Sequence, residues 1–161
     1  MEPLSVKHAR YMTEVLAEPS LYDYTGGEAP SMKQLENRYA AQAVGHSDDG
    51  SQWWLNWVVM RPDLDKPLGY VQATVEDDGT RLVADIAWVI SPDWQGKGIA
   101  SEATRAMIAW LRSNGVHSFT AHIHPDHQAS MKVAQNQALH ATTVKKDGET
   151  RWESPQQESV R

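Results

Sequence analysis

The stretch between Leu82 and Leu111 constrains the fold of this chain most strongly. It begins with the nearly unbroken apolar run LVADIAWVI, which is typical of a strand inside a sheet. It ends with apolar residues spaced three and four apart from Ile99 onward, which predicts a helix with one buried face. The turn between them, SPDWQGKG, holds two glycines, each of which costs backbone entropy. A turn of this kind indicates that another group comes close to the main chain.

The turn from Gln95 to Ala100 has the properties of an anion site. A helix begins inside it, so the first N–H groups of that helix lack partners and carry the positive end of the helix dipole. The small residues at 96, 98 and 100 let a bulky anion approach, and Lys97 adds charge. A Gly-x-Gly sequence is also found in ordinary turns, so both interpretations, phosphate cradle and plain turn, stay open on these residues alone.

The remaining pattern predicts alternating helices and strands in a single domain over residues 1–161, with a frayed tail at 155–161. Helices are expected at 5–18, 32–43, from 99 to Gly115, and 128–139. Strands are expected at 52–60, 68–76, 81–90 and 116–124, with a hairpin over 142–154. Two crossovers are long enough to join parallel strands, which predicts a mixed sheet covered by helices.

Composition and charge exclude several classes of protein. The formal charge of −6 argues against generic binding to nucleic acid or to an anionic membrane. The chain has no cysteine, so disulfides and thiolate metal sites are ruled out. No apolar stretch approaches the roughly 20 residues that cross a bilayer, and the start lacks the apolar core of a secretory signal. These features predict a cytoplasmic protein.

Two motifs carry a family resemblance. DIAWVISPDWQGKGIASEA resembles the pyrophosphate-binding motif of the Gcn5-related N-acetyltransferases (GNAT), Arg/Gln-x-x-Gly-x-Gly/Ala, with Gln95, Gly98 and Ala100 at its signature positions. HPDHQASMKVAQNQALH is similar to the H-P-x-N-x-x-S segment of the ribosomal-protein (RimJ/RimL-like) branch. The resemblance implies an α/β (α+β) fold: a mixed, mostly antiparallel twisted sheet of about six to seven strands, flanked by four helices. Its central parallel strands, here 82–90 and 116–124, would splay apart.

The resemblance also implies acetyl-CoA as co-substrate, with no metal. Val89 and Ile90 would bind the pantetheine arm through backbone groups, and an N–H near Val89 would stabilise the oxyanion. The pyrophosphate would be held by the main-chain amides of the turn, which are those of Gln95, Gly96, Lys97, Gly98, Ile99 and Ala100.

The acid and the base are less clear from the resemblance. Ala134 stands where many members carry a catalytic Tyr. The resemblance to the RimJ/RimL-like branch, which carries a Ser at the position of Ser130, implies Ser130 as the donor to the CoA sulfur, although it also fits an ordinary helix hydroxyl. His127 replaces the motif's Asn and would bind the cofactor arm, and Ala138-Leu139 replaces Gly-Phe. A carboxylate at Asp85, if buried, would hold a proton strongly enough to act as a base through water, although a strand Asp is as often exposed or ion-paired.

Glu149, in the C-terminal hairpin, is a second candidate base, or simply a hairpin residue. The acceptor, a small-molecule amine or a peptide N-terminus, would enter opposite the cofactor, with Tyr22, Tyr24 and Trp54 as candidate walls. The same aromatic residues are also suited to packing against the sheet. The resemblance further allows a homodimer.

Two alternatives belong to other classes of protein. His122, His124 and His127 form H-x-H-x-x-H, a spacing that zinc sites use. The missing Tyr also suits a non-catalytic acyl-CoA-binding protein of the same fold, which would bind acetyl-CoA without turning it over.

Overall fold

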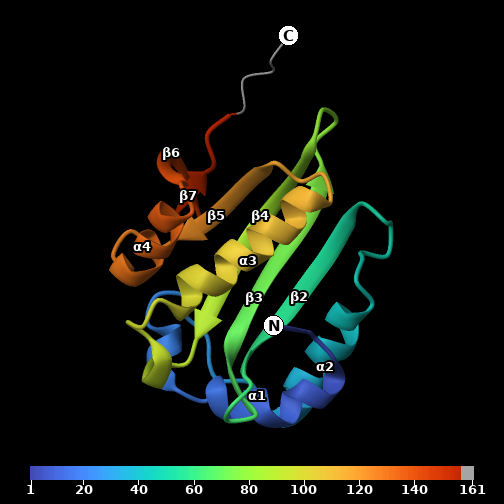
Figure 1. Cartoon of the computed structure of the whole chain (residues 1–161), viewed down its shortest axis with the longest axis vertical. Coiled ribbons are helices and arrows are strands. Elements are labelled where there is room, and N and C mark those ends of the chain that lie inside the picture. Colours follow the sequence, from blue (N-terminus) through green and yellow to red (C-terminus); the bar gives the residue numbers. More distant parts are fainter. Residues whose placement is uncertain (157–161) are drawn as a thin grey trace.

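The computed structural model describes residues 1–156, so most of the predicted frayed tail, residues 155–161, lies outside them. A single seven-stranded sheet crosses the molecule (Figure 1). Its strands, in chain order, are β1 (Glu2–Pro3), β2 (Gln52–Arg61), β3 (Lys66–Asp77), β4 (Leu82–Ile90), β5 (Ser118–Ile123), β6 (His140–Lys146) and β7 (Glu149–Glu153). The helices are α1 (Ala9–Val15), α2 (Met32–Ala43), α3 (Ile99–Ser113) and α4 (Gln128–Asn136).

The strand order, β1-β2-β3-β4-β5-β7-β6, contains one parallel pair, β4 with β5. That pair has three rungs, from Val83↔Ser118 to Asp85↔Thr120, after which the strands pair no further although β4 continues to Ile90. The expected splay of the central parallel strands is therefore present. The second crossover joins β5 to β6, which run in the same direction as expected but are not neighbours, because β7 lies between them and pairs antiparallel with both.

The helices bury a larger hydrophobic core on one face of the sheet and a smaller one on the other. One core lies between the sheet and α3 and α4, and Met107, Leu111, Phe119 and Ala134 are among its buried residues. A smaller core lies between the other face and α1 and α2, around Met12, Leu35 and Val58. Figure 1 shows α3 lying over the sheet and running roughly along β3 and β4, with α1 and α2 at one end. The C-terminal end of β4 and the turn before α3 lie at the same end of the molecule as α1.

Local sequence signals account for most element boundaries. Ser31 caps α2 by accepting from the Gln34 N–H at 3.2 Å, and the Gln34 side chain accepts from the Ser31 N–H at 2.9 Å. The first helix is shorter than predicted, because residues 6–8 form a 3-10 turn before α1. The fourth helix ends at Asn136 rather than 139, since Ala138 adopts a left-handed φ of 62°.

The helices of the described residues do not meet the requirements of a membrane-spanning segment. Within residues 1–156, no helix combines the length and the apolar character that crossing a bilayer requires.

Candidate functional site

The turn before α3 presents a row of unpaired amides. Gly96 and Gly98 adopt left-handed φ angles of 74° and 78°, and a Cβ at either position would meet nothing within 4 Å. Over residues 1–156, the N–H groups of 96–101 bond to no protein acceptor. The N–H of Gln95, expected to join them, instead donates to the Pro92 carbonyl at 3.3 Å. The free set therefore begins one residue later than predicted, and it lies at the positive end of the α3 dipole.

Two cations and an aromatic ring flank this turn. The Lys97 Nζ lies 5.0 Å from the centroid of the Trp94 ring, and the Arg61 Cζ lies 4.9 Å from the same centroid. Arg61 also donates to Asp63 at 2.8 Å. The Gln95 side chain donates to the Ile90 carbonyl at 2.9 Å, which ties the turn to the end of β4. The turn is thus fixed to the sheet and carries positive charge beside its free amides.

Alternation along β4 decides which main-chain groups face the gap between β4 and β5. The Ser91 N–H donates to the Leu68 carbonyl at 2.7 Å, and the Asp78 N–H donates to the Arg81 carbonyl at 3.0 Å. Both bonds fit the continuous β3–β4 register, in which bonded and non-bonded pairs alternate. Odd-numbered residues of β4 therefore direct their N–H and C=O groups toward β3, and even-numbered residues direct theirs toward β5.

This alternation changes the expectation for Val89. A Cβ on Gly69 would collide with the Val89 carbonyl, because that carbonyl points at β3. Trp88 and Ile90 are the residues whose main-chain groups face the gap, and the Ile90 carbonyl already accepts from the side chain of Gln95. The groups left to pair with an extended ligand there are those of Trp88 and the N–H of Ile90.

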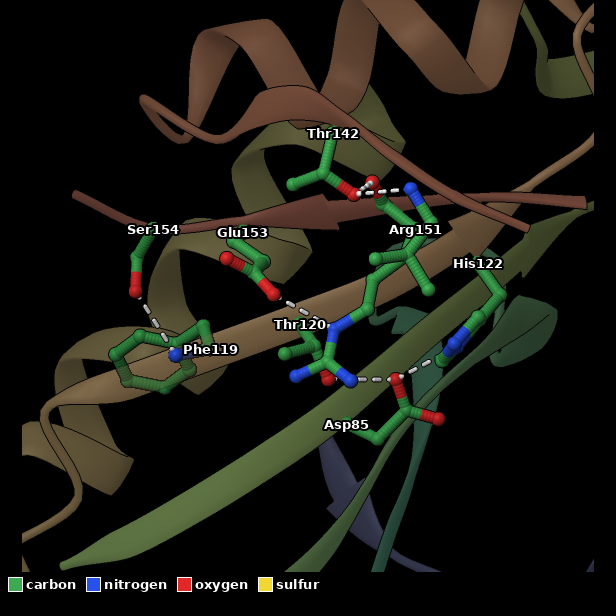
Figure 2. A network of polar contacts seen from close by, with 9 residues as sticks. Asp85, Phe119, Thr120, His122, Thr142, Arg151, Glu153 and Ser154 are labelled. Carbon is green, nitrogen blue, oxygen red and sulfur yellow. Dashed lines mark hydrogen bonds and ion pairs between the residues drawn. The ribbon is translucent and has the colours of Figure 1, made fainter. Parts of the chain in front are cut away.

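Asp85 and His122 form a hydrogen-bonded pair where β4 and β5 part (Figure 2). The His122 Nδ1 lies 3.1 Å from the Asp85 Oδ1, and the buried Thr120 hydroxyl donates to the same oxygen at 2.9 Å. A carboxylate only accepts, so Nδ1 carries a proton, and in the neutral imidazole this arrangement leaves the Nε2 lone pair free. The burial on which the role of Asp85 as a direct base depended is absent, since its side chain is 52% exposed.

Neighbouring strands supply further charges around this pair. Arg151 of β7 lies opposite His122 in the register, and its Nε lies 2.8 Å from the Glu153 Oε1. Figure 2 shows Thr142 of β6 on the far side, where its hydroxyl donates to the Arg151 carbonyl at 2.8 Å. The Asp85 carboxylate, with Arg151 and Glu153 nearby, holds His122 in one tautomer and one orientation.

Ser130, His127 and Tyr24 form a second cluster. The Ser130 Oγ lies 3.3 Å from the His127 Nε2 on the first turn of α4. The Tyr24 ring stacks on His127 with centroids 4.5 Å apart and planes at 13°, and it also contacts His124 at 5.3 Å. Burial, with a smaller contribution from the charge of His124, lowers the pKa of His127 below its ordinary 6.5. His127 is thus held neutral beside the Ser130 hydroxyl.

The other predicted residues are dispersed. The Tyr22 hydroxyl donates to the Leu16 carbonyl at 2.7 Å, which is a packing role. Trp54 lines an open depression beside the 47–52 turn and is not among the residues that line the cavity under α2. Glu149 begins β7 opposite Lys146, and its side chain makes no hydrogen bond or ion pair with the described residues. Only Tyr24 among the three candidate walls is brought to another predicted site residue.

The three histidines of H-x-H-x-x-H do not converge. His122 bonds to Asp85, whereas His124 and His127 each contact the Tyr24 ring. Among residues 1–156 there is no group of three or more His, Cys, Asp or Glu side chains placed to hold a metal ion.

Sequence reasoning missed the pairing of His122 with Asp85, and it missed Arg61. The alternation of Thr120 and His122 on one strand was a usable signal for a shared face. The strand register brings Thr120 and His122 to Asp85, from which they are separated by 35 and 37 positions in the sequence. No local sequence pattern predicts contacts over such separations.

Solved structures share this architecture. An acetyltransferase from Thermus thermophilus is 21% identical, with a TM-score of 0.73 over 96% of this chain and 95% of its own. AAC(6')-Ib, solved with paromomycin and acetyl-CoA, is 15% identical, with a TM-score of 0.77 over 95% of this chain and 90% of its own. A GNAT acetyltransferase from Streptococcus pneumoniae is 18% identical, with a TM-score of 0.68 over 95% of this chain and 96% of its own. At such identities the likeness shows the fold alone.

The sequence itself gives the family. No curated protein matches the chain. The family model described as an acetyltransferase (GNAT) domain matches residues 1–138, which is most of its length. With the glycine turn, the free amides and the parted strands, this match leads to one conclusion: the chain belongs to the GNAT acetyltransferase family.

Proposed function

We propose that this protein is an acetyl-CoA-dependent N-acetyltransferase that acetylates a primary amine by direct attack within a ternary complex. The observation that carries the proposal is the row of unpaired amides at 96–101, which lies beside the gap between β4 and β5. Unpaired N–H groups at a helix N-terminus bind phosphate, and an open strand edge binds an extended amide chain. AAC(6')-Ib, of the same fold, was solved with acetyl-CoA.

The proposed cofactor site follows the geometry of the turn. The amides of residues 96–101 bind the pyrophosphate, with Lys97 and Arg61 adding charge beside it. The pantetheine arm pairs with the edge groups of Trp88 and Ile90, which brings the thioester into the gap. The same N–H groups are the candidate donors to the negative charge that builds on the thioester oxygen.

The Asp85–His122 pair is the proposed base. His122 Nε2 accepts a proton from the acceptor ammonium, and Asp85, bonded to Nδ1, stabilises the resulting imidazolium. The neutral amine then forms the new C–N bond while the C–S bond breaks. Ser130 donates a proton to the departing thiolate and recovers one from the amine nitrogen, which loses its second proton as it becomes the amide. His127 lies within 3.3 Å to orient the Ser130 hydroxyl. The HPDHQAS segment supports placing the chain near the RimJ/RimL-like branch.

The test combines a binding and a turnover measurement. Isothermal titration with acetyl-CoA measures binding, and release of free CoA thiol across a panel of small amines and peptides measures turnover. Because the chain has no cysteine, the thiol assay has no background from the protein. Binding with turnover on any amine supports the proposal.

A second function is consistent with the missing Tyr, because the buried Ala134 at that position has no proton to donate. Acetyl-CoA binding without turnover on any amine would identify a non-catalytic acyl-CoA-binding protein. No binding at all would reject both functions.

A further inference from the structure

A cavity lies between α2 and the face of the sheet opposite α3. Its volume is about 170 Å³. The elements around it are α2, β2 and β3, with Leu4 and Leu16 adding an apolar margin. Its polar lining consists of Arg38, Tyr39, Gln42, Asn56, Tyr70 and Gln72. This concentration of polar side chains contrasts with the apolar core beneath α3.

One buried polar group of this cavity has no hydrogen-bond partner among the described residues. Tyr39 is 4% exposed, and over residues 1–156 its buried hydroxyl has no hydrogen-bond partner. A buried hydroxyl without a partner destabilises the fold, so a hydrogen-bonding group that enters the cavity would stabilise it. Arg38, which is exposed and so lies at the cavity mouth, has no carboxylate within ion-pair distance among the described residues.

The lining favours a negatively charged oxygen ligand. Burial raises the pKa of the Tyr39 and Tyr70 phenols, and the charge of Arg38 counteracts this in both, so the guanidinium lies close to both rings. Both phenols remain protonated at neutral pH and can donate. A guanidinium with phenol donors around it fits a carboxylate, which accepts several hydrogen bonds at once.

The volume limits the size of the ligand. A cavity of roughly 150 Å³ holds benzene, whereas sites for drug-sized molecules run from roughly 300 to 1,000 Å³. The 170 Å³ here suits a carboxylate and a few carbon atoms. A whole aminoglycoside such as the paromomycin bound by AAC(6')-Ib is far larger.

The cavity is one strand away from the proposed reaction site. Gln72 pairs across with Ala87 of β4, and Tyr70 pairs with Val89. Neighbouring strands are about 4.8 Å apart, and β4 itself borders the gap. Ala87 places only a methyl group between Gln72 and that gap, and Asp85 lies on the same face of β4 two residues earlier. An acceptor held at Arg38 can therefore extend its amine across β4 toward His122.

We infer that this cavity binds the carboxylate of the amine acceptor, so that the substrate class is a small amino acid or a related aminocarboxylate. The inference rests on the proposed function for the acceptor being an amine. It assigns Arg38 and Tyr39 to recognition of the acceptor.

The experiment compares matched acceptors. Glycine, β-alanine, γ-aminobutyrate and 6-aminohexanoate are each assayed against the corresponding amide, which keeps the amine and removes the charge. We expect kcat/KM to favour at least one acid over its amide by roughly tenfold or more, as a charge-assisted hydrogen bond does. Arg38→Gln should abolish that preference, mainly by raising KM for the acid, with a much smaller effect on the amide. Arg105→Gln, on the exposed side of α3, is the matched control.

Tyr39→Phe gives a second, independent readout. Removing an unpartnered hydroxyl should leave the melting temperature unchanged or raise it, while it weakens the acid preference several-fold. A hydroxyl with a merely structural role would lower the melting temperature and leave the preference intact, which contradicts the inference.

Thermal shift separates this inference from the proposed function, because it needs no turnover. The preferred acid should raise the melting temperature of the wild-type protein and not that of Arg38→Gln. If no amine is acetylated but this shift appears, the transferase proposal fails and the carboxylate site stands. If amines are acetylated but acids and amides react equally, or Arg38→Gln keeps the preference, the carboxylate site is rejected and the transferase stands.

Discussion

The His122 Nδ1 lies 3.1 Å from the Asp85 Oδ1, and this contact spans the point where β4 and β5 stop pairing. The two residues come from different strands, so the pair exists only because the last β4–β5 rung, Asp85↔Thr120, sets their register. It gives the parted strands a polar edge where their pairing ends.

The first prediction concerns this pair. His122→Gln should lower kcat by about 10²-fold or more, since general-base catalysis contributes about 10² to 10⁴, while acetyl-CoA affinity stays unchanged. Asp85→Asn should also lower kcat, because an amide neither stabilises the imidazolium nor fixes the proton on Nδ1. Free imidazole should partly restore His122→Ala. His140→Gln, on an exposed residue of β6, is the control, and equal rates for both histidine variants would remove His122 from the mechanism.

The second prediction concerns the amide turn. Gly98→Ala should weaken acetyl-CoA binding about tenfold or more in isothermal titration, because a side chain at φ 78° shifts the free amides. Gly79→Ala, in the β3–β4 hairpin at φ 93°, imposes a similar backbone strain of about 1–2 kcal/mol far from the turn. Both variants should lose similar stability, and only the first should lose affinity. Equal affinities would exclude the turn as the pyrophosphate site.

The third prediction concerns Ser130. Ser130→Ala should reduce kcat by about tenfold to a hundredfold without changing the dissociation constant of acetyl-CoA, since the hydroxyl acts only when the thiolate leaves. Ser113→Ala, which removes an exposed hydroxyl bonded to the Trp110 carbonyl at 2.6 Å, is the control. A rate unaffected by Ser130→Ala would assign the proton to another donor.

The fourth prediction concerns stability at the end of α4. Ala138 holds a left-handed φ of 62°, and the Leu139 N–H closes the helix by donating to the Ala134 carbonyl at 3.0 Å. Ala138→Gly should raise the free energy of unfolding by about 1 kcal/mol, as relief of the Cβ strain exceeds the entropy that glycine adds. Urea denaturation measures the change, and a destabilised variant would show that the strain is not stored there.

The fifth prediction is a pH dependence. The pKa of His127 is lowered in the folded protein, so the unfolded chain takes up the proton first as pH falls through 6.5. Unfolding free energy should therefore fall between pH 7.5 and pH 5. His127→Gln should reduce this decline, whereas His117→Gln, on an exposed residue, should not. The groups that face His127 are His124, Tyr24 and Ser130, so these must stay unchanged in both variants.

Local signals in the sequence were sufficient for the helices and most strands. The capping box of Ser31 with Gln34 and the glycine turn before Ile99 mark helix starts at the observed residues. The end of α4 was misplaced because Ala138 adopts a conformation that sequence reasoning assigns to glycine. The two-residue β1 escaped notice, since Glu2 and Pro3 form a strand only by pairing with β2.

The site was less accessible from sequence than the fold. The glycine turn could be found because consecutive residues build it. The main-chain groups of Trp88, and not those of Val89, face the gap because bonded and non-bonded pairs alternate along β4. This alternation can be assigned only once the β3–β4 register is known. The cavity near Arg38 joins residues from α2, β2 and β3, so its lining depends on tertiary packing.

The three rungs between β4 and β5 have a mechanical consequence. They are the strand pairing that connects β1–β4 to β5–β7, and beyond them the sheet has an interior edge. An extended ligand that pairs with this edge would add hydrogen bonds between β1–β4 and β5–β7, and these bonds would be lost when the ligand dissociates. Binding of such a ligand would then stabilise the protein, and its release would lower the free energy of unfolding.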